Sequence, residues 1–138
     1  MSDELKVYTD GASRGNPGPA SAAFIITDGE GTVLQERSEY LGKKTNNQAE
    51  YTAVINALEM AKEYTDGDLQ VNSDSNLLVK QLQGEWRVKS SNIKPLYRKV
   101  KRLTRFFDKV SFVHRNREHK MIGRADFLCN RKLDESGS

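Results

Sequence analysis

The order of strand-like and helix-like segments is the feature of this sequence that most constrains its fold. Three strand-like runs come first, at Leu5–Asp10, Ala20–Thr27 and Thr32–Tyr40, with a turn over Asp28–Gly31 between the last two. Loops this short join antiparallel neighbours. Apolar residues then recur at helical spacing over Asn47–Tyr64, so we expect a long helix after the three strands.

The second half of the chain alternates strands and helices. We expect strands at Leu69–Asp74 and Val110–His114, and helices at Leu77–Leu82, Pro95–Phe107 and Arg124–Leu133. Strands that are connected through helices run parallel, by right-handed crossovers. The sequence therefore predicts an α/β fold with a five-stranded mixed sheet, in which three antiparallel strands are followed by parallel ones, and helices cover both faces.

The composition is typical of a folded globular chain. Its 138 residues are 36% hydrophobic and 30% charged, which is enough to bury a core. We expect a single domain over residues 1–135 and a disordered tail at 136–138. No apolar run reaches the roughly 18 residues of a membrane span, and Met1–Glu4 lacks the form of a signal peptide. Because Cys129 is the only cysteine, no intramolecular disulfide can form. We expect a cytoplasmic monomer without a membrane partner.

Charge is divided unevenly along the chain. From Arg87 to Lys132 there are fifteen Lys and Arg against three acids, whereas the rest has seven basic and sixteen acidic residues. Such a split favours an anionic partner, nucleic acid above all, held by the basic half. The alternative is that basic residues only solvate an exposed helix. The basic face of the helix expected at Pro95–Phe107 consists of Arg98, Lys101, Arg102 and Arg105.

Four acidic residues fall at the ends of the expected elements. Asp10 and Asp74 each close a strand, and parallel neighbours would bring both to the same carboxyl edge of the sheet. Glu50 lies in the first turn of the helix that starts at Asn47, and Asp126 opens the last helix. Clustered carboxylates repel each other unless a cation lies among them, and hard divalent ions such as Mg²⁺ prefer oxygen ligands. The pattern therefore indicates metal-dependent phosphoryl chemistry.

Each of these acids also has a purely structural interpretation. Asp10 can be a turn residue, and Asp74 can cap the helix that follows it. Glu50 can complete a capping box with Asn47, and Asp126 can favour the positive end of its helix. Glu50, however, shares a helix face with apolar residues, where an unpaired carboxylate is costly. Four acids at element ends together favour a shared site.

Four motifs resemble those of type 1 ribonuclease H, in the same order and over almost the whole chain. They are Tyr8–Ala20 with its glycine-rich turn, Thr45–Tyr51, Asn72–Ser75 and Arg124–Asp126. The resemblance implies the ribonuclease H-like fold and an endoribonuclease that cuts the RNA strand of RNA–DNA hybrids, leaving 3′-hydroxyl and 5′-phosphate ends. It also implies two Mg²⁺ ions, or Mn²⁺ in their place. The catalytic metal ligands that it implies are Asp10, Glu50, Asp74 and Asp126.

That family contacts the hybrid through its glycine-rich turn, its paired asparagines and a residue after the third acid. Small residues in the turn let the backbone approach RNA closely enough to read a 2′-hydroxyl. A plain tight turn is the alternative for this segment. The substrate-contacting residues implied here are Gly11, Ser13, Gly15, Asn16, Thr45, Asn46, Asn47 and Asn76.

Two departures from the family pattern concern substrate binding and proton transfer. The link Gln83–Ser91 is too short for the basic helix that many bacterial members insert, so the chain resembles the compact form. Trp86 in this link can contact the hybrid or be a packed anchor. The family's loop histidine stands ten residues before the last acid, where this chain has Asn116. His119, seven residues before that acid, is the candidate catalytic histidine, and we expect His114 to be structural.

Three functions remain open at this point. The leading hypothesis is a hybrid-specific endoribonuclease, and its partner is an RNA–DNA hybrid. One alternative is a catalytically silent nucleic-acid-binding module, which the presence of all four acids disfavours. The other is a related nuclease that also cuts double-stranded RNA.

Overall fold

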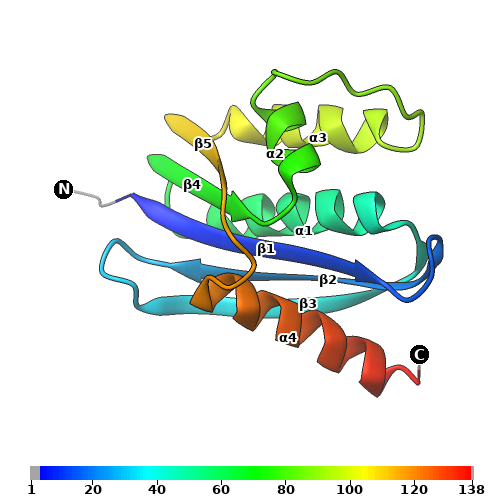
Figure 1. The fold of residues 1–138 in the computed structure, drawn as a ribbon. Coiled ribbons are helices and arrows are strands. Elements are labelled where there is room, and N and C mark those ends of the chain that lie inside the picture. Colours follow the sequence, from blue (N-terminus) through cyan, green and yellow to red (C-terminus); the bar gives the residue numbers. More distant parts are fainter. Residues whose placement is uncertain (1–3, 138) are drawn as a thin grey trace.

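The computed structural model describes residues 4–137 and contains a five-stranded sheet with helices on both faces (Figure 1). Strands β1 (Leu5–Ser13), β2 (Gly18–Thr27) and β3 (Val33–Lys44) form antiparallel pairs. Strands β4 (Asp68–Ser73) and β5 (Lys109–His114) run parallel to β1, and the sheet order is β3-β2-β1-β4-β5. The predicted mixed sheet is confirmed.

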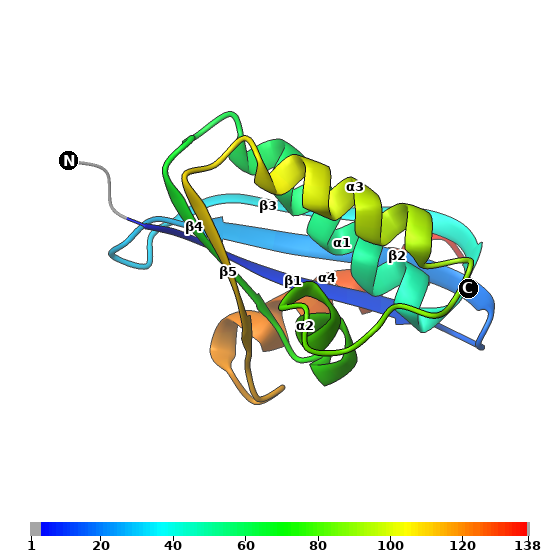
Figure 2. The same cartoon turned by 90° about the horizontal axis from the view of Figure 1, so that it is seen from above.

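The helices pack on the sheet in two layers. Helices α1 (Asn46–Ala61) and α3 (Lys94–Thr104) lie side by side on one face, as the view from above shows (Figure 2). Helix α4 (Lys120–Glu135) covers β1, β2 and β3 on the opposite face, and the short α2 (Asn76–Leu82) contacts β5. The main core lies on the α1 side, and a smaller one lies under α4. Between residues 4 and 137 no helix is long and apolar enough to cross a membrane.

Thr45 determines where α1 begins. Its Oγ1 accepts a hydrogen bond from the Gln48 amide at 3.1 Å, and Gln48 Oε1 accepts one from the Thr45 amide at 2.9 Å. This reciprocal pair is a capping box. The alternative in which Glu50 completes a capping box with Asn47 is therefore wrong, and Glu50 lies further into the helix with its carboxylate available for another purpose.

The first strand extends beyond the end that the sequence predicts. It was expected to close at Asp10, but β1 continues to Ser13 because its second half keeps pairing with β2, up to Ser13 opposite Ala20. The parallel pairing with β4 stops earlier, at Tyr8 opposite Asn72. Asp10 therefore lies inside a strand, two residues beyond the last β1–β4 pair.

The last helix starts earlier than the sequence predicts. Helix α4 begins at Lys120 rather than at Arg124, because His119 acts as its N-cap residue. Asp126 consequently lies in the second turn of α4, and the prediction that it opens the helix is wrong.

Candidate active site

Three carboxylates from different elements converge at the edge of the sheet. Asp10 of β1, Glu50 of α1 and Asp74, which follows β4, each place one carboxylate oxygen within 4.8 Å of the others. Asp10 is only 5% exposed. Asp126 lines the same cavity, of about 370 Å³, but its side chain is exposed and lies outside this group of three. The four acids predicted from the sequence thus border one cavity, and three of them have carboxylate oxygens within 4.8 Å of one another.

Gly11, the β1 residue after Asp10, packs directly against the first turns of α1. Its amide donates a hydrogen bond to Glu50 Oε1 at 3.0 Å. A Cβ atom on Gly11 would lie 2.3 Å from backbone atoms of Ala49 and Glu50, so no other residue fits without moving the helix. The structure therefore gives Gly11 a packing role that holds Glu50 in place, in addition to the substrate contact that the sequence predicts.

The electrostatics of the cluster favour a bound cation. Burial, followed by the charges of Asp74 and Asp126, raises the pKa of Asp10 to about 8, against the small opposing effect of the Gly11 amide. Burial and then the charge of Asp10 raise the pKa of Glu50 well above its ordinary value. Without a cation the cluster therefore retains protons at neutral pH. Several carboxylate oxygens in such a cavity are the donor set of a hard divalent ion.

Two residues that the sequence analysis missed act on the fourth acid and on the cavity mouth. Asn130 Nδ2 donates to Asp126 Oδ1 at 3.3 Å and to the Asp126 carbonyl at 3.0 Å, which restricts the Asp126 side chain. Their spacing of four residues on one helix was the available signal. Arg117 lines the cavity, with Nε 3.8 Å from Asp74 Oδ2; a polar loop residue of this kind gives no sequence signal.

The two predicted substrate-binding motifs meet at the mouth of the cavity. Asn16 Oδ1, in the turn between β1 and β2, accepts a hydrogen bond from the Asn46 amide at 3.1 Å. Ser13 Oγ contacts the Gly15 carbonyl and donates to the Lys44 carbonyl at 2.9 Å. Gly15 has a φ of +115°, a backbone conformation in which a residue with a Cβ atom would be strained. The predicted substrate residues that line the cavity are Gly11, Ser13, Asn46 and Asn47.

The other predicted substrate residues have different positions. Thr45 caps α1, so its hydroxyl is already engaged. Asn76 is exposed at the first residue of α2, beside the cavity but not lining it.

Two contacts hold the His119 side chain in place at the end of its polar loop. Its Nδ1 accepts a hydrogen bond from the Met121 amide at 3.2 Å, and its ring stacks on Tyr8 with 5.2 Å between centroids. His119 does not line the carboxylate cavity. His114 Nε2 lies 3.2 Å from the Asp74 carbonyl, so it connects β5 to the end of β4.

The compact link between α2 and α3 forms a basic hollow. Trp86 is 46% exposed, so the interpretation of Trp86 as a packed anchor is wrong. It borders a hollow of about 670 Å³ together with Tyr97 and several cations. The cations of this hollow are Arg87, Lys94 and Arg98. On the basic face predicted for α3, Lys101 is tied to the Leu82 carbonyl at 3.0 Å, so this face is less free than its sequence suggests.

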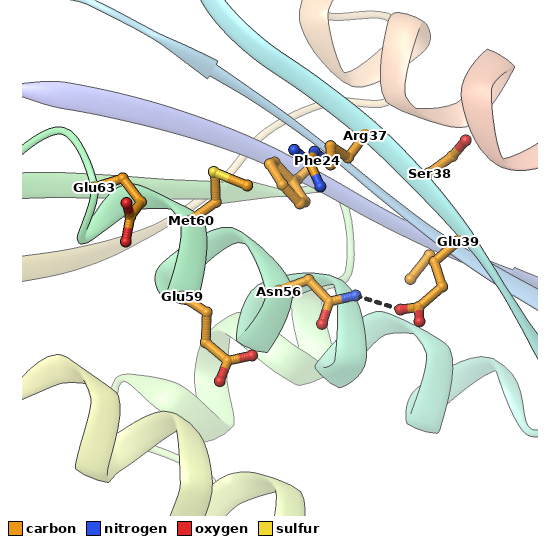
Figure 3. A pocket seen from close by; sticks show the side chains of 9 residues that line it. Phe24, Arg37, Ser38, Glu39, Asn56, Glu59, Met60 and Glu63 are labelled. Atoms are coloured by element: carbon orange, nitrogen blue, oxygen red, sulfur yellow. Dashed lines mark hydrogen bonds between the residues drawn. The ribbon is translucent and has the colours of Figure 1, made fainter.

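A further hollow, of about 660 Å³, lies between α1 and β3 (Figure 3). Asn56 Nδ2 donates to Glu39 Oε1 across it at 2.9 Å. Glu59 of α1 and Glu63, which follows the end of that helix, lie apart rather than pointing toward one another, as Figure 3 shows. Among residues 4–137, only Asp10, Glu50 and Asp74 form a group that could hold a metal ion. The carboxylate cavity is therefore the candidate for metal-dependent chemistry.

Comparison with known proteins places these features in a family. Residues 8–131 match a family model described as reverse transcriptase-like. The chain is 40% identical to ribonuclease HI of Halobacterium salinarum over 132 residues, 96% of this chain and 65% of that protein. It is 33% identical to ribonuclease H of Chlorobium phaeovibrioides over 140 residues, 98% of this chain and 93% of that protein.

A solved structure agrees with these sequence matches. The crystal structure of LC11-RNase H1 in complex with an RNA/DNA hybrid superposes with a TM-score of 0.90 and 39% identity, covering 98% of this chain and all of that one. The chain spans less than two thirds of the halobacterial relative, at 65%, and 36% of a bifunctional protein of Mycobacterium tuberculosis that it also matches.

Proposed function

Because the chain belongs to the ribonuclease H family, we propose that it is an endoribonuclease that hydrolyses the RNA strand of RNA–DNA hybrids, leaving 3′-hydroxyl and 5′-phosphate ends. The observation that carries the proposal is the convergence of Asp10, Glu50 and Asp74 within 4.8 Å. The hybrid bound to LC11-RNase H1, which is similar over 98% of this chain, supports the choice of substrate. The chain is proposed to act as a monomer in the cytoplasm, with one ribonuclease H domain over its described residues.

Mg²⁺ is the proposed cofactor, with Mn²⁺ as a substitute, and Asp10, Glu50, Asp74 and Asp126 are its proposed ligands. When bound, a pair of such ions supplies an activated water and stabilises the departing 3′-oxygen. The contribution of the chain is to hold the ligands ready. The Gly11 amide fixes Glu50 at 3.0 Å, and Asn130 restrains Asp126 at 3.3 Å.

Substrate binding is proposed at the mouth of the cavity and in the basic hollow. The bond between Asn16 and the Asn46 amide gives the mouth a fixed shape, in which small side chains and amides can reach a 2′-hydroxyl. The hollow of Trp86 offers an aromatic surface and cations for the other strand. The residues proposed to contact the hybrid are Gly11, Ser13, Gly15, Asn16, Thr45, Asn46, Asn47 and Asn76.

His119 is proposed to carry a proton during release of the 3′-oxygen or of the product. Since Nδ1 accepts a hydrogen bond from the Met121 amide, the neutral ring carries its proton on Nε2, which is the nitrogen available for transfer. Its ring stacks on Tyr8, which stands two residues before Asp10 in β1 and packs on the α4 side of the sheet.

The ligand assignment is tested by Asp74→Asn, with Asp66→Asn, an exposed loop carboxylate, as the matched control. We expect Asp74→Asn to lose hybrid cleavage while hybrid binding, measured by fluorescence anisotropy, persists. Asp66→Asn should behave as wild type in both assays. Near-wild-type turnover of Asp74→Asn would remove the metal-ligand assignment.

A further inference from the structure

The loop between β5 and α4 contributes one side chain to the carboxylate cavity, and it is Arg117 rather than a histidine. We propose that Arg117 binds the scissile phosphate, holding a non-bridging oxygen as negative charge develops there. This inference rests on the function proposed above and concerns the same site. The side chain through which this loop contacts the reacting phosphate is then an arginine.

The position of Arg117 suits an incoming anion. Its Nε lies 3.8 Å from Asp74 Oδ2, while its side chain is 84% exposed. The guanidinium therefore stands at the mouth of the cavity, beside the carboxylates, with most of its surface open to solvent. A guanidinium carries five N–H donors in a planar fork that matches phosphate oxygens. Its Nε faces Asp74, and the terminal nitrogens remain available to a ligand.

Anchors on both sides fix the loop that presents Arg117. Arg115 Nε donates to Asn72 Oδ1 at 2.8 Å, and the Arg115 amide donates to the Ser73 carbonyl at 2.8 Å, so the first residue of the loop is anchored to β4. At its other end the His119 ring stacks on Tyr8 of β1 with 5.2 Å between centroids, and the His119 amide closes a turn on the Asn116 carbonyl at 2.9 Å. Arg117 lies between these two anchors. The backbone that carries it is thus positioned before any substrate arrives.

The ion pair with Asp74 is of the kind that a competing cation can displace. Exposed ion pairs contribute little, and a divalent ion that takes Asp74 as a ligand removes the charge that attracts the guanidinium. Arg117 then turns to the remaining anion of the site, which is the phosphate. Because a guanidinium stays charged throughout the working pH range, Arg117 stabilises charge and transfers no proton.

The test compares Arg117→Ala and Arg117→Lys with Arg37→Ala. Arg37 is an exposed arginine of β3 in the hollow beside α1 (Figure 3), so its removal makes the same charge change away from the carboxylates. We expect Arg117→Ala to lower kcat/KM on a hybrid by about 100-fold, the usual effect of losing one donor to a developing oxyanion. Arg117→Lys should recover part of the loss, and Arg37→Ala should show none.

Two further readouts separate a phosphate contact from other roles. Added guanidinium ion should restore at least about tenfold of the activity of Arg117→Ala, and imidazole should not. Mn²⁺ binding without substrate, measured by calorimetry, should stay the same or tighten by no more than about fivefold, because only a weak competing ion pair is lost.

Wild-type kcat/KM in Arg117→Ala, or a loss explained by weaker Mn²⁺ binding, would overturn the inference while leaving the proposed function intact. A wild-type protein that fails to cleave the hybrid would overturn the proposed function, and the inference with it.

Discussion

Replacing Asp10 by asparagine should abolish cleavage and at the same time stabilise the metal-free protein. Asp10 is 5% exposed and its pKa is about 8, because burial and the charges of Asp74 and Asp126 oppose its ionisation. The unfolded chain releases this proton near the ordinary value of 3.8. Between those two pH values the folded protein binds more protons than the unfolded chain. The free energy of unfolding therefore falls as pH rises from about 4 to about 8.

The size of the effect follows from this interval. A pH of 7 lies about 3 units above the pKa of the Asp10 carboxyl in the unfolded chain, and each unit changes the free energy of unfolding by about 1.4 kcal/mol. An ionisable Asp10 thus favours unfolding by up to about 4 kcal/mol relative to a neutral residue of the same shape. Asp10→Asn removes this penalty. For a chain of this length we expect the melting temperature to rise by about 10 °C at pH 7.

The assay is thermal and urea unfolding in EDTA at pH 4 and pH 7, with Asp66→Asn as the surface control. The gain from Asp10→Asn should be large at pH 7 and much smaller at pH 4, where the folded protein keeps the Asp10 proton and the unfolded chain keeps it about half of the time. Added Mg²⁺ should stabilise the wild type much more than the variant. An equal gain at both pH values, or no gain at pH 7, would refute the electrostatic reasoning.

Three other sets of variants test the remaining parts of the site. Gly11→Ala should destabilise the fold by about 2 kcal/mol or more, measured by urea unfolding, because its Cβ would lie 2.3 Å from the α1 backbone; wild-type stability would show that α1 can shift freely. His119→Ala should lower kcat about 10- to 100-fold with KM little changed, and His119→Asn, which keeps an N-cap side chain, should do the same. A loss confined to His119→Ala, or equal turnover of both variants and the wild type between pH 6 and 9, would mean that the ring has no catalytic role. Neutralising the basic face of α3 should raise KM more than it lowers kcat and flatten the salt dependence of hybrid binding, whereas an unchanged salt slope would place this face away from the substrate. The four residues to be changed together are Arg98, Lys101, Arg102 and Arg105.

The arrangement of the sheet could be predicted because few connections are possible. Loops as short as Asp28–Gly31 leave only antiparallel neighbours, and helical crossovers leave only parallel ones. The same rule placed Asp10 and Asp74 on adjacent parallel strands, which the pairing of β1 with β4 confirms. Glu50 was expected to face the sheet because it shares a side of its helix with apolar residues, and its bond to the Gly11 amide confirms this.

The details that the sequence could not supply depend on contacts between distant segments. The continuation of β1 past Asp10 is set by its partner β2, not by its own residues. The start of α4 at Lys120 depends on His119, which caps the helix while it stacks on Tyr8. Arg117 lines the cavity from a loop whose first residue, Arg115, is anchored on β4. Nothing local in the sequence distinguishes Arg117 from its basic neighbours.

One measurement tests the central claim most directly: cleavage of three end-labelled substrates of the same sequence, an RNA–DNA hybrid, double-stranded RNA and double-stranded DNA. Each is incubated with the purified chain in Mg²⁺, Mn²⁺ or EDTA, and the products are resolved on a denaturing gel. We expect the RNA strand of the hybrid to be cut in Mg²⁺ and in Mn²⁺, with 3′-hydroxyl ends, while the double-stranded DNA stays intact and EDTA stops all cleavage. An intact hybrid in both metals, or cleavage that persists in EDTA, would contradict the assignment of the Asp10, Glu50 and Asp74 cluster to metal-dependent hydrolysis of RNA in hybrids.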